Sequence, residues 1–125
     1  TEARVFLIVD AILQKKVSAA IVEINEFLQA GGYEGLLLNQ LSNQFQKILM
    51  ARRLLDSKKT EQEIIEILGG HPFAAKKFLQ TVRTFSQVKI ESLILSLTRT
   101  GFQMRYYDKA FIPYFIEKLI LETAG

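Results

Sequence analysis

The chain has 125 residues, of which 49% are hydrophobic and 23% charged, with a formal net charge of +3. This length suits one domain with a single core, and the hydrophobic share excludes a disordered tail. Because the chain has no cysteine, disulfides and thiolate metal sites are excluded, which fits the reducing cytoplasm.

The first half of the chain predicts three helices, because its apolar residues recur three and four apart. Residues 4–14 are apolar around most of the helix circumference, so this helix should lie deep in the core or against a neighbour. Residues 17–30 predict an amphipathic helix that the glycine pair 31–32 ends. Residues 33 or 34 to 57 predict the longest helix, with a leucine and phenylalanine stripe, which we expect to be the spine of the domain.

A corner with specific local signals follows the long helix. Thr60 has Glu63 three residues further on, which is the capping-box spacing of a helix start. Gly69 suits the left-handed conformation that ends a helix. Pro72 suits the first position of the next helix, where its missing N–H needs no partner. That helix is expected to run to Phe85.

Two further helices complete the chain. Residues 87–106 predict a long helix in which Gly101 costs about 1 kcal/mol relative to alanine and allows a kink. A break follows, with Asp108 as the N-cap of the last helix. That helix should cover residues 109–123, but Pro113 is late for a first-turn position, so it favours a start near residue 111.

No stretch shows the alternation of period two that is typical of strands. The predicted fold is therefore all-α, a single helical-bundle domain of about six to seven helices over residues 1–125. No apolar run approaches the roughly 18 residues that a membrane span needs, and the first residues lack the layout of a signal peptide. We therefore expect a cytoplasmic protein without a membrane partner.

The chain carries little that could support catalysis. His71 is its only histidine, so neither a transition-metal site nor a nucleophilic triad is supported, and we expect this side chain to begin the helix at Pro72. The glycines at 31 and 32 lack the spacing of a phosphate-binding loop. We expect no catalytic, cofactor-binding or metal-binding residue, and no cofactor.

Two interpretations of the corner remain open, one structural and one functional. Residues 71–89 contain four lysines and arginines and no acid, which predicts a basic patch. Together with the corner, this allows a DNA-binding helix-turn-helix over residues 72–86. The alternative is a purely structural corner, whose core Phe78 would fill. The candidate DNA-binding residues are Lys76, Lys77, Gln80, Arg83 and Thr84.

Aromatic residues are dense near the end of the chain. They are Phe102, Tyr106, Tyr107, Phe111, Tyr114 and Phe115. Packing in the core is the default interpretation of such a group. The alternative is a protein interface, in which tyrosine and phenylalanine are enriched and arginine suits the rim. The candidate interface residues are Arg99, Phe102, Arg105, Tyr106, Tyr107 and Tyr114.

Residues 45–85 resemble the C-terminal helical domain of the bacterial DNA polymerase III delta subunit, which is one component of the clamp loader. The similar pattern is a long helix, a polar link, a capped helix that ends in Leu-Gly, and then His-Pro-Phe with small residues and lysines, here residues 68–77. The opening at residues 5–12, with its Asp-Ala-Ile, is similar to the entry of the family into this domain. The sequence Arg-Tyr-Tyr-Asp at 105–108 departs from the usual turn of the family.

The resemblance implies a collar domain, an all-helical block by which the clamp-loader subunits assemble into a ring and load the sliding clamp onto DNA during replication. It implies the tau/gamma and delta-prime subunits as partners. It also implies that AAA+-like domains, expected before Thr1 and absent from this chain, contact the clamp, and that DNA is contacted only indirectly. The delta subunit of such a polymerase holoenzyme is expected not to hydrolyse ATP, so we expect a non-catalytic domain, with the helix-turn-helix as the alternative.

Overall fold

The computed structural model describes residues 2–124, and all side chains of this range except those of residues 2, 3, 109, 112, 113, 116, 123 and 124. Over residues 2–124 the chain forms seven α-helices and one short 3-10 helix, without strands. In chain order they are α1 (Glu2–Leu13), α2 (Val17–Gln29), α3 (Glu34–Leu55), α4 (Glu61–Leu68), α5 (Pro72–Val82), α6 (Gln87–Met104), η1 (Lys109–Phe111) and α7 (Ile112–Ala124). The prediction of an all-α fold with six to seven helices is confirmed.

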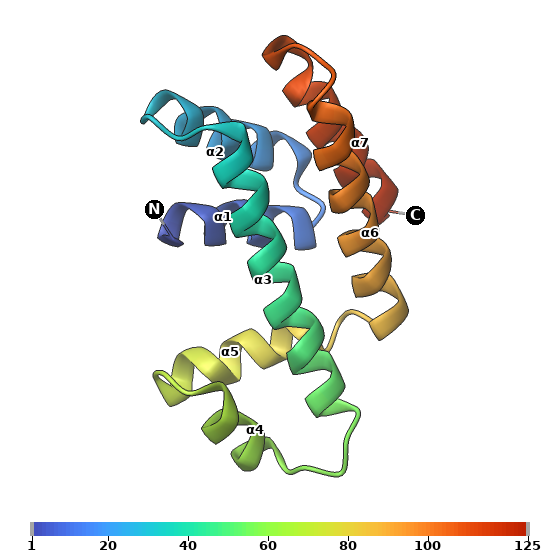
Figure 1. Cartoon of the computed structure of the whole chain (residues 1–125). Coiled ribbons are helices and arrows are strands. Elements are labelled where there is room, and N and C mark those ends of the chain that lie inside the picture. Colours follow the sequence, from blue (N-terminus) through green and yellow to red (C-terminus); the bar gives the residue numbers. More distant parts are fainter. Residues whose placement is uncertain (1, 125) are drawn as a thin grey trace.

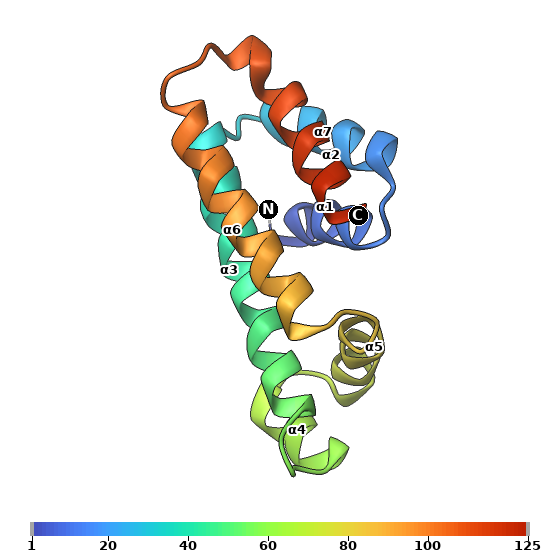
Figure 2. The ribbon, with the colours of Figure 1, turned by 90° about the vertical axis from the view of Figure 1, so that its right-hand side faces the viewer.

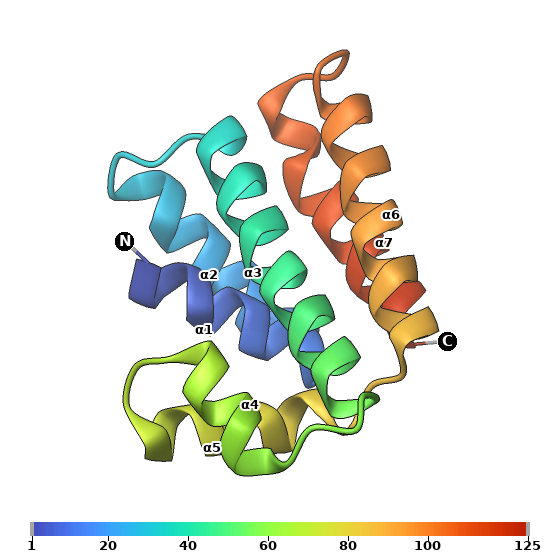
Figure 3. The same ribbon diagram turned by 60° about the horizontal axis from the view of Figure 1, so that its bottom comes forward.

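The long helix α3 is the spine of the molecule, as predicted. The α1–α2 pair packs on one side of it, and α6 runs along its other side (Figure 1). Helix α7 packs against α6 and also contacts α2 and α1, so it joins the two sides of the bundle (Figure 2). Helices α4 and α5 pack across the far end of α3 (Figure 3).

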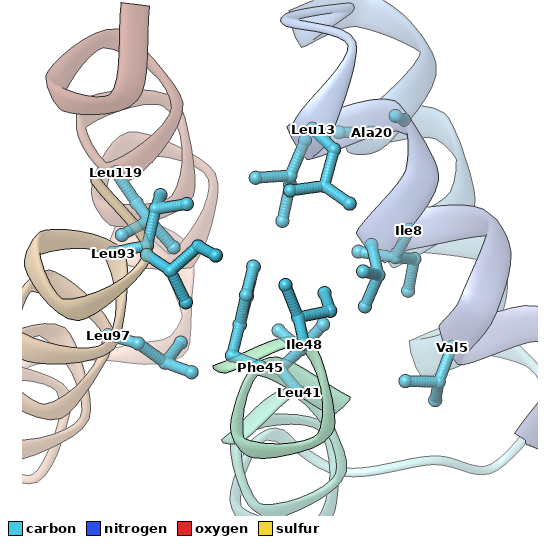
Figure 4. Packing of buried hydrophobic residues seen from close by; sticks show 14 of the residues in the cluster. Val5, Ile8, Leu13, Ala20, Leu41, Phe45, Ile48, Leu93, Leu97 and Leu119 are labelled. Carbon is cyan, nitrogen blue, oxygen red and sulfur yellow. The ribbon is translucent and has the colours of Figure 1, made fainter. Parts of the chain in front are cut away.

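The main core lies where α3 passes between α1 and the α6–α7 pair. Phe45 and Ile48 of α3 point toward this centre, where Leu93 of α6 and Leu13 of α1 meet them (Figure 4). Fully burying a side chain of this size contributes about 1.5–3 kcal/mol, so this cluster is the main source of stability. The largest side chains with almost no exposure are Phe45, Ile8, Ile12, Leu37, Leu41, Ile48, Ile64, Leu79, Ile90, Leu119 and Ile120.

The corner formed by α4 and α5 has the predicted local structure. The hydroxyl of Thr60 accepts a hydrogen bond from the Glu63 N–H at 3.2 Å, and the Glu63 carboxylate accepts one from the Thr60 N–H at 3.1 Å, so the capping box is formed. Gly69 ends α4 with a φ of +72°, a conformation in which a side chain would be strained. Nδ1 of His71 accepts from the Phe73 N–H at 3.2 Å, so this histidine caps α5.

The capping box shifts the titration of Glu63. The Thr60 backbone N–H, and next the Thr60 hydroxyl, lower the pKa of Glu63 from its ordinary value of 4.5 because both stabilise the ionised carboxylate. A group whose pKa is lowered by folding contributes stability above its ordinary pKa. That contribution is lost as the pH falls through the lower folded value.

The two helices around Phe85 differ from the prediction in their bounds. Helix α5 ends at Val82, earlier than the predicted Phe85, because the Thr84 hydroxyl donates to the Thr81 carbonyl at 2.7 Å and the Phe85 N–H donates to the Val82 carbonyl at 3.0 Å. These two hydrogen bonds form a tight turn, so the helix does not continue to Phe85. The hydroxyl of Ser86 then caps α6, which adds an N-cap that the sequence pattern had not indicated.

The last two helices also refine the prediction. Helix α6 passes through Gly101 and ends at Met104, where the Arg105 and Tyr106 N–H groups turn back to carbonyls of the last helical turn. Asp108 accepts a hydrogen bond from the Ala110 N–H at 3.0 Å and starts the 3-10 turn η1. Because α7 begins only at Ile112, Pro113 lies in its first turn, where a missing N–H leaves no hydrogen bond unmade.

Candidate functional site

The two candidate sites of the sequence lie at opposite ends of the molecule. The turn between α6 and α7, with the aromatic residues, is at one end, and the α4–α5 corner, with the basic residues, is at the other (Figures 1 and 2). The two sites are therefore separate surfaces, and each is described on its own.

The default interpretation of the aromatic residues, packing in the core, is wrong for most of them. Five rings are between 50 and 74% exposed, whereas Phe115 is 5% exposed. Phe102 lies on the outer face of α6, and Tyr106 and Tyr107 lie in the turn after α6 has ended at Met104. We name these five rings the aromatic end. They are Phe102, Tyr106, Tyr107, Phe111 and Tyr114.

The rings of the aromatic end are held by one another in two groups. Phe102 and Tyr106 have ring centroids 5.4 Å apart. Tyr107 lies 5.9 Å from Phe111 and 5.3 Å from the buried Phe115, and Tyr114 lies 5.4 Å from Phe115. Such pairs contribute about 0.5–1.5 kcal/mol each beyond the area they bury. Contacts of this kind restrict the rotation of the rings, and such restriction lowers the entropy cost of binding.

The two candidate arginines of the interface flank these rings. Arg99 and Arg105 are both exposed, one on the outer part of α6 and one directly after its last residue. Arg105 and Phe102 also line an open groove of about 470 Å³ between α6 and the start of α3, together with Glu34 and Leu38. All six predicted interface residues therefore lie at the same end of the molecule.

The candidate DNA-binding residues lie on the exposed side of α5 and in the turn that follows it. Lys76, Gln80 and Arg83 follow one another at helical spacing on the exposed side, but Arg83 has an ion pair with Glu61 at 3.5 Å. Lys77 is exposed and lies over the Phe73 ring, with its Nζ 6.0 Å from the ring centroid. Thr84 uses its hydroxyl inside the turn that ends α5. Arg83 and Thr84 therefore have partners within the chain, whereas Lys76 and Gln80 are exposed.

Sequence reasoning did not identify the role of Arg52, which lies in the last turn of α3. Its Nη1 donates to the carbonyls of Phe85 at 3.2 Å and Arg83 at 3.4 Å, and its Nη2 lies 2.7 Å from Asp56. Cations stabilise the carboxyl end of a helix because its last carbonyls lack partners. Arg52 thus ties the end of α3 to the end of α5.

A second groove, of about 760 Å³, lies between α1, α3 and α5 on the corner side. Phe6, Met50 and Phe78 give it an apolar lining. The prediction that Phe78 fills the core between the corner helices is wrong in part, because Phe78 is only partly buried while its neighbour Leu79 is fully buried. This groove has few side chains that could act in catalysis, because the imidazole of His71 already caps α5.

The described side chains include no group of three or more histidine, aspartate or glutamate residues placed to hold a metal ion together. Between residues 2 and 124, no helix has the length and apolar character that crossing a membrane requires.

Comparison with known proteins points to one family. The family described as DNA polymerase III delta subunit, C-terminal domain, matches residues 2–121. Among solved structures, the chain is similar in fold to a DNA clamp loader delta protein of Bacillus subtilis, with a TM-score of 0.74 and 21% sequence identity. The match covers 95% of this chain and 36% of that protein, so the chain corresponds to a part of it. No curated protein matches the chain significantly.

Proposed function

Because the chain belongs to the family of C-terminal domains of the DNA polymerase III delta subunit, we propose that it is an assembly domain, a helical collar that packs against the collars of other clamp-loader subunits. The partners would be the tau/gamma and delta-prime subunits. Their packing would hold the complex together in the cytoplasm while the sliding clamp is loaded onto DNA during replication. Contact with the clamp would belong to AAA+-like domains outside this chain.

The observation that carries this proposal is the aromatic end. Its five rings are at least half exposed, contact one another and Phe115 in two groups, and lie beside the exposed Arg99 and Arg105. Tyrosine, phenylalanine and arginine are the residue types that supply binding energy at protein interfaces. We assign the tyrosines and Phe102 to the centre of the interface and the two arginines to its rim.

We propose that this domain takes no part in catalysis. The residues offer no phosphate-binding loop, and the one histidine is engaged in capping α5. The domain would therefore act by holding subunits together, and any hydrolysis of ATP would be carried out elsewhere in the polymerase holoenzyme.

The alternative of a DNA-binding helix-turn-helix is not retained. The family and the similar structure both belong to clamp-loader components and give this alternative no support. The ion pair of Arg83 with Glu61 also places an acid beside the basic patch on which this alternative was based.

Isothermal titration of this chain with the purified tau/gamma and delta-prime subunits tests the proposal. The wild-type chain is expected to bind at least one of them, with similar affinity at about 50 and 200 mM salt because buried rings, not phosphates, supply the energy. Tyr107→Ala and Tyr114→Ala should each weaken binding roughly tenfold or more. Phe73→Ala is the matched control, since its ring is also exposed but lies at the opposite end.

Two results would contradict the proposal. One is the absence of binding to all of the clamp-loader subunits at micromolar concentration. The other is sequence-selective binding of a labelled DNA duplex that weakens steeply with salt and that Lys76→Ala abolishes while Tyr107→Ala does not.

A further inference from the structure

The outer face of α6 carries an apolar stripe that the fold leaves uncovered. Val88, Leu95 and Phe102 follow at intervals of seven residues, which is two helical turns, so they lie in a line along one face. Their side chains are 76, 58 and 59% exposed. The opposite face of the same helix is buried in the core. A helix with apolar residues on both faces has more apolar surface than its own bundle covers.

This stripe continues into the aromatic end. The Phe102 ring contacts that of Tyr106 in a tilted arrangement, with the centroids 5.4 Å apart, and Tyr106 is also exposed. We name Val88, Leu95, Phe102 and Tyr106 the α6 stripe. Its helical part, from Val88 to Phe102, spans about 21 Å at roughly 1.5 Å per helical residue.

The charges beside the α6 stripe are asymmetric. Residues 92–107 contain two arginines and no acid. Of these, Arg99 lies between Leu95 and Phe102 in the sequence, and both arginines are exposed. Glu34 of α3 lines the groove beside Arg105. Near the start of α6, Glu91 is engaged by Arg53 at 3.9 Å. The half of the stripe toward the aromatic end is therefore basic.

We propose that the α6 stripe is the binding site for an amphipathic helix from a neighbouring subunit of the clamp loader. Its apolar residues would lie along the stripe, and its acidic residues would face Arg99 and Arg105. This inference rests on the proposed function and specifies which surface is used and which chemistry recognises it. An α-helix can bind along this stripe. Apolar side chains that recur every two turns on one helix pack against the same repeat on a second helix, when the two helices cross at a shallow angle.

The test compares Leu95→Glu with a matched control, Leu7→Glu. Leu7 is 52% exposed, close to the 58% of Leu95, but it lies on α1. Affinity for the purified tau/gamma and delta-prime subunits is measured by isothermal titration, and circular dichroism melting checks that each variant is folded. Leu95→Glu should weaken binding roughly tenfold or more, and Leu7→Glu should leave it unchanged. Arg99→Glu combined with Arg105→Glu should also weaken binding, most strongly at low salt.

The outcomes separate the inference from the proposed function. If the wild-type chain binds none of these subunits, the proposed function fails and the inference fails with it. If the wild type binds and Leu95→Glu binds equally well, the inference fails while the proposed function stands. If the wild-type chain alone forms a dimer that Leu95→Glu dissociates, the stripe receives a second copy and the inference is overturned. Should Leu95→Glu not fold, Val88→Glu at a more exposed position of the stripe repeats the test.

Discussion

The α4–α5 corner and the aromatic end turn the chain in different ways. In the corner, side-chain caps and glycines set each change of direction from within a few residues, as with Thr60 and Glu63 or His71 and Phe73. At the aromatic end, a single aspartate cap is followed by rings that mainly contact one another. Polar caps therefore set the direction of the chain at the corner, whereas the aromatic end leaves large apolar side chains exposed for a partner.

The two regions also differ in how they are attached to the rest of the bundle. In α4 only Ile64 is buried, and in α5 the buried residues are Ala75, Leu79 and Val82. The aromatic end instead follows directly from α6, which shares the main core with α3. Substitutions in the corner should therefore change stability, and substitutions at the aromatic end should change binding.

Among the substitutions considered, the largest effect on stability is expected at a buried position of α5. Leu79→Ala should lower the free energy of unfolding by about 2–5 kcal/mol, because Leu79 is fully buried and leaves a cavity. Phe78→Ala should cost less, since Phe78 lies at the edge of the groove between α1 and α5. Urea unfolding followed by circular dichroism measures both. A greater loss for Phe78→Ala than for Leu79→Ala would contradict the packing described for α5.

A smaller loss is expected when the tie between α3 and α5 is removed. Arg52→Met keeps the apolar part of the side chain but loses the bonds to the Phe85 and Arg83 carbonyls. A hydrogen bond to a charged group contributes about 1.5–3 kcal/mol, and a loss in this range is expected in urea unfolding. Arg53→Met, a more exposed arginine on the same helix, is the control and should change stability little. Equal losses for both variants would rule out the tie.

The capping box should have a smaller effect, part of which depends on pH. Thr60→Ala removes the N-cap hydroxyl and should cost roughly 0.5–2 kcal/mol at neutral pH. In the wild type, the contribution of Glu63 should fade as the pH falls below 4.5, because its pKa is lowered in the folded protein. Glu63→Gln should flatten this part of the stability curve. Unfolding midpoints between about pH 7 and pH 3 test this, and an unchanged curve in Glu63→Gln would contradict it.

The smallest effect on stability is expected at the aromatic end. Tyr106→Ala should lower the free energy of unfolding by the energy of the ring pair with Phe102 and by less than about 0.5 kcal/mol beyond that, because the ring is exposed. The same variant should weaken the binding of other clamp-loader subunits. A loss of several kcal/mol in thermal or urea unfolding would show that this ring supports the fold itself, and the contrast between the two regions would then fail.

Much of the fold could be predicted because its signals are local. The partners of the capping box are three residues apart, and Pro72 and Gly69 act through their own backbones. The resemblance to the family, carried mainly by residues 45–85, was confirmed by the match to residues 2–121. Patterns with short sequence separation were thus sufficient for the helices and their order.

The rest could not be predicted because it depends on distant contacts. The carbonyls that Arg52 binds are 31 and 33 residues away in the sequence. Whether Tyr107 lies inside or outside depends on α6 ending at Met104, which no residue type near that point indicates clearly. The candidate interface residues were named by composition, and the structure adds that they share one end of the molecule. Their role in binding stays a prediction.

The most direct test of the assembly role uses the absence of cysteine from the chain. Tyr107→Cys and Lys76→Cys each introduce one exposed thiol, at opposite ends of the molecule, and the rate of thiol labelling is measured before and after the other clamp-loader subunits are added. We expect labelling at position 107 to slow strongly in the complex and labelling at position 76 to stay the same. Protection at position 76 with unchanged labelling at position 107 would contradict the account.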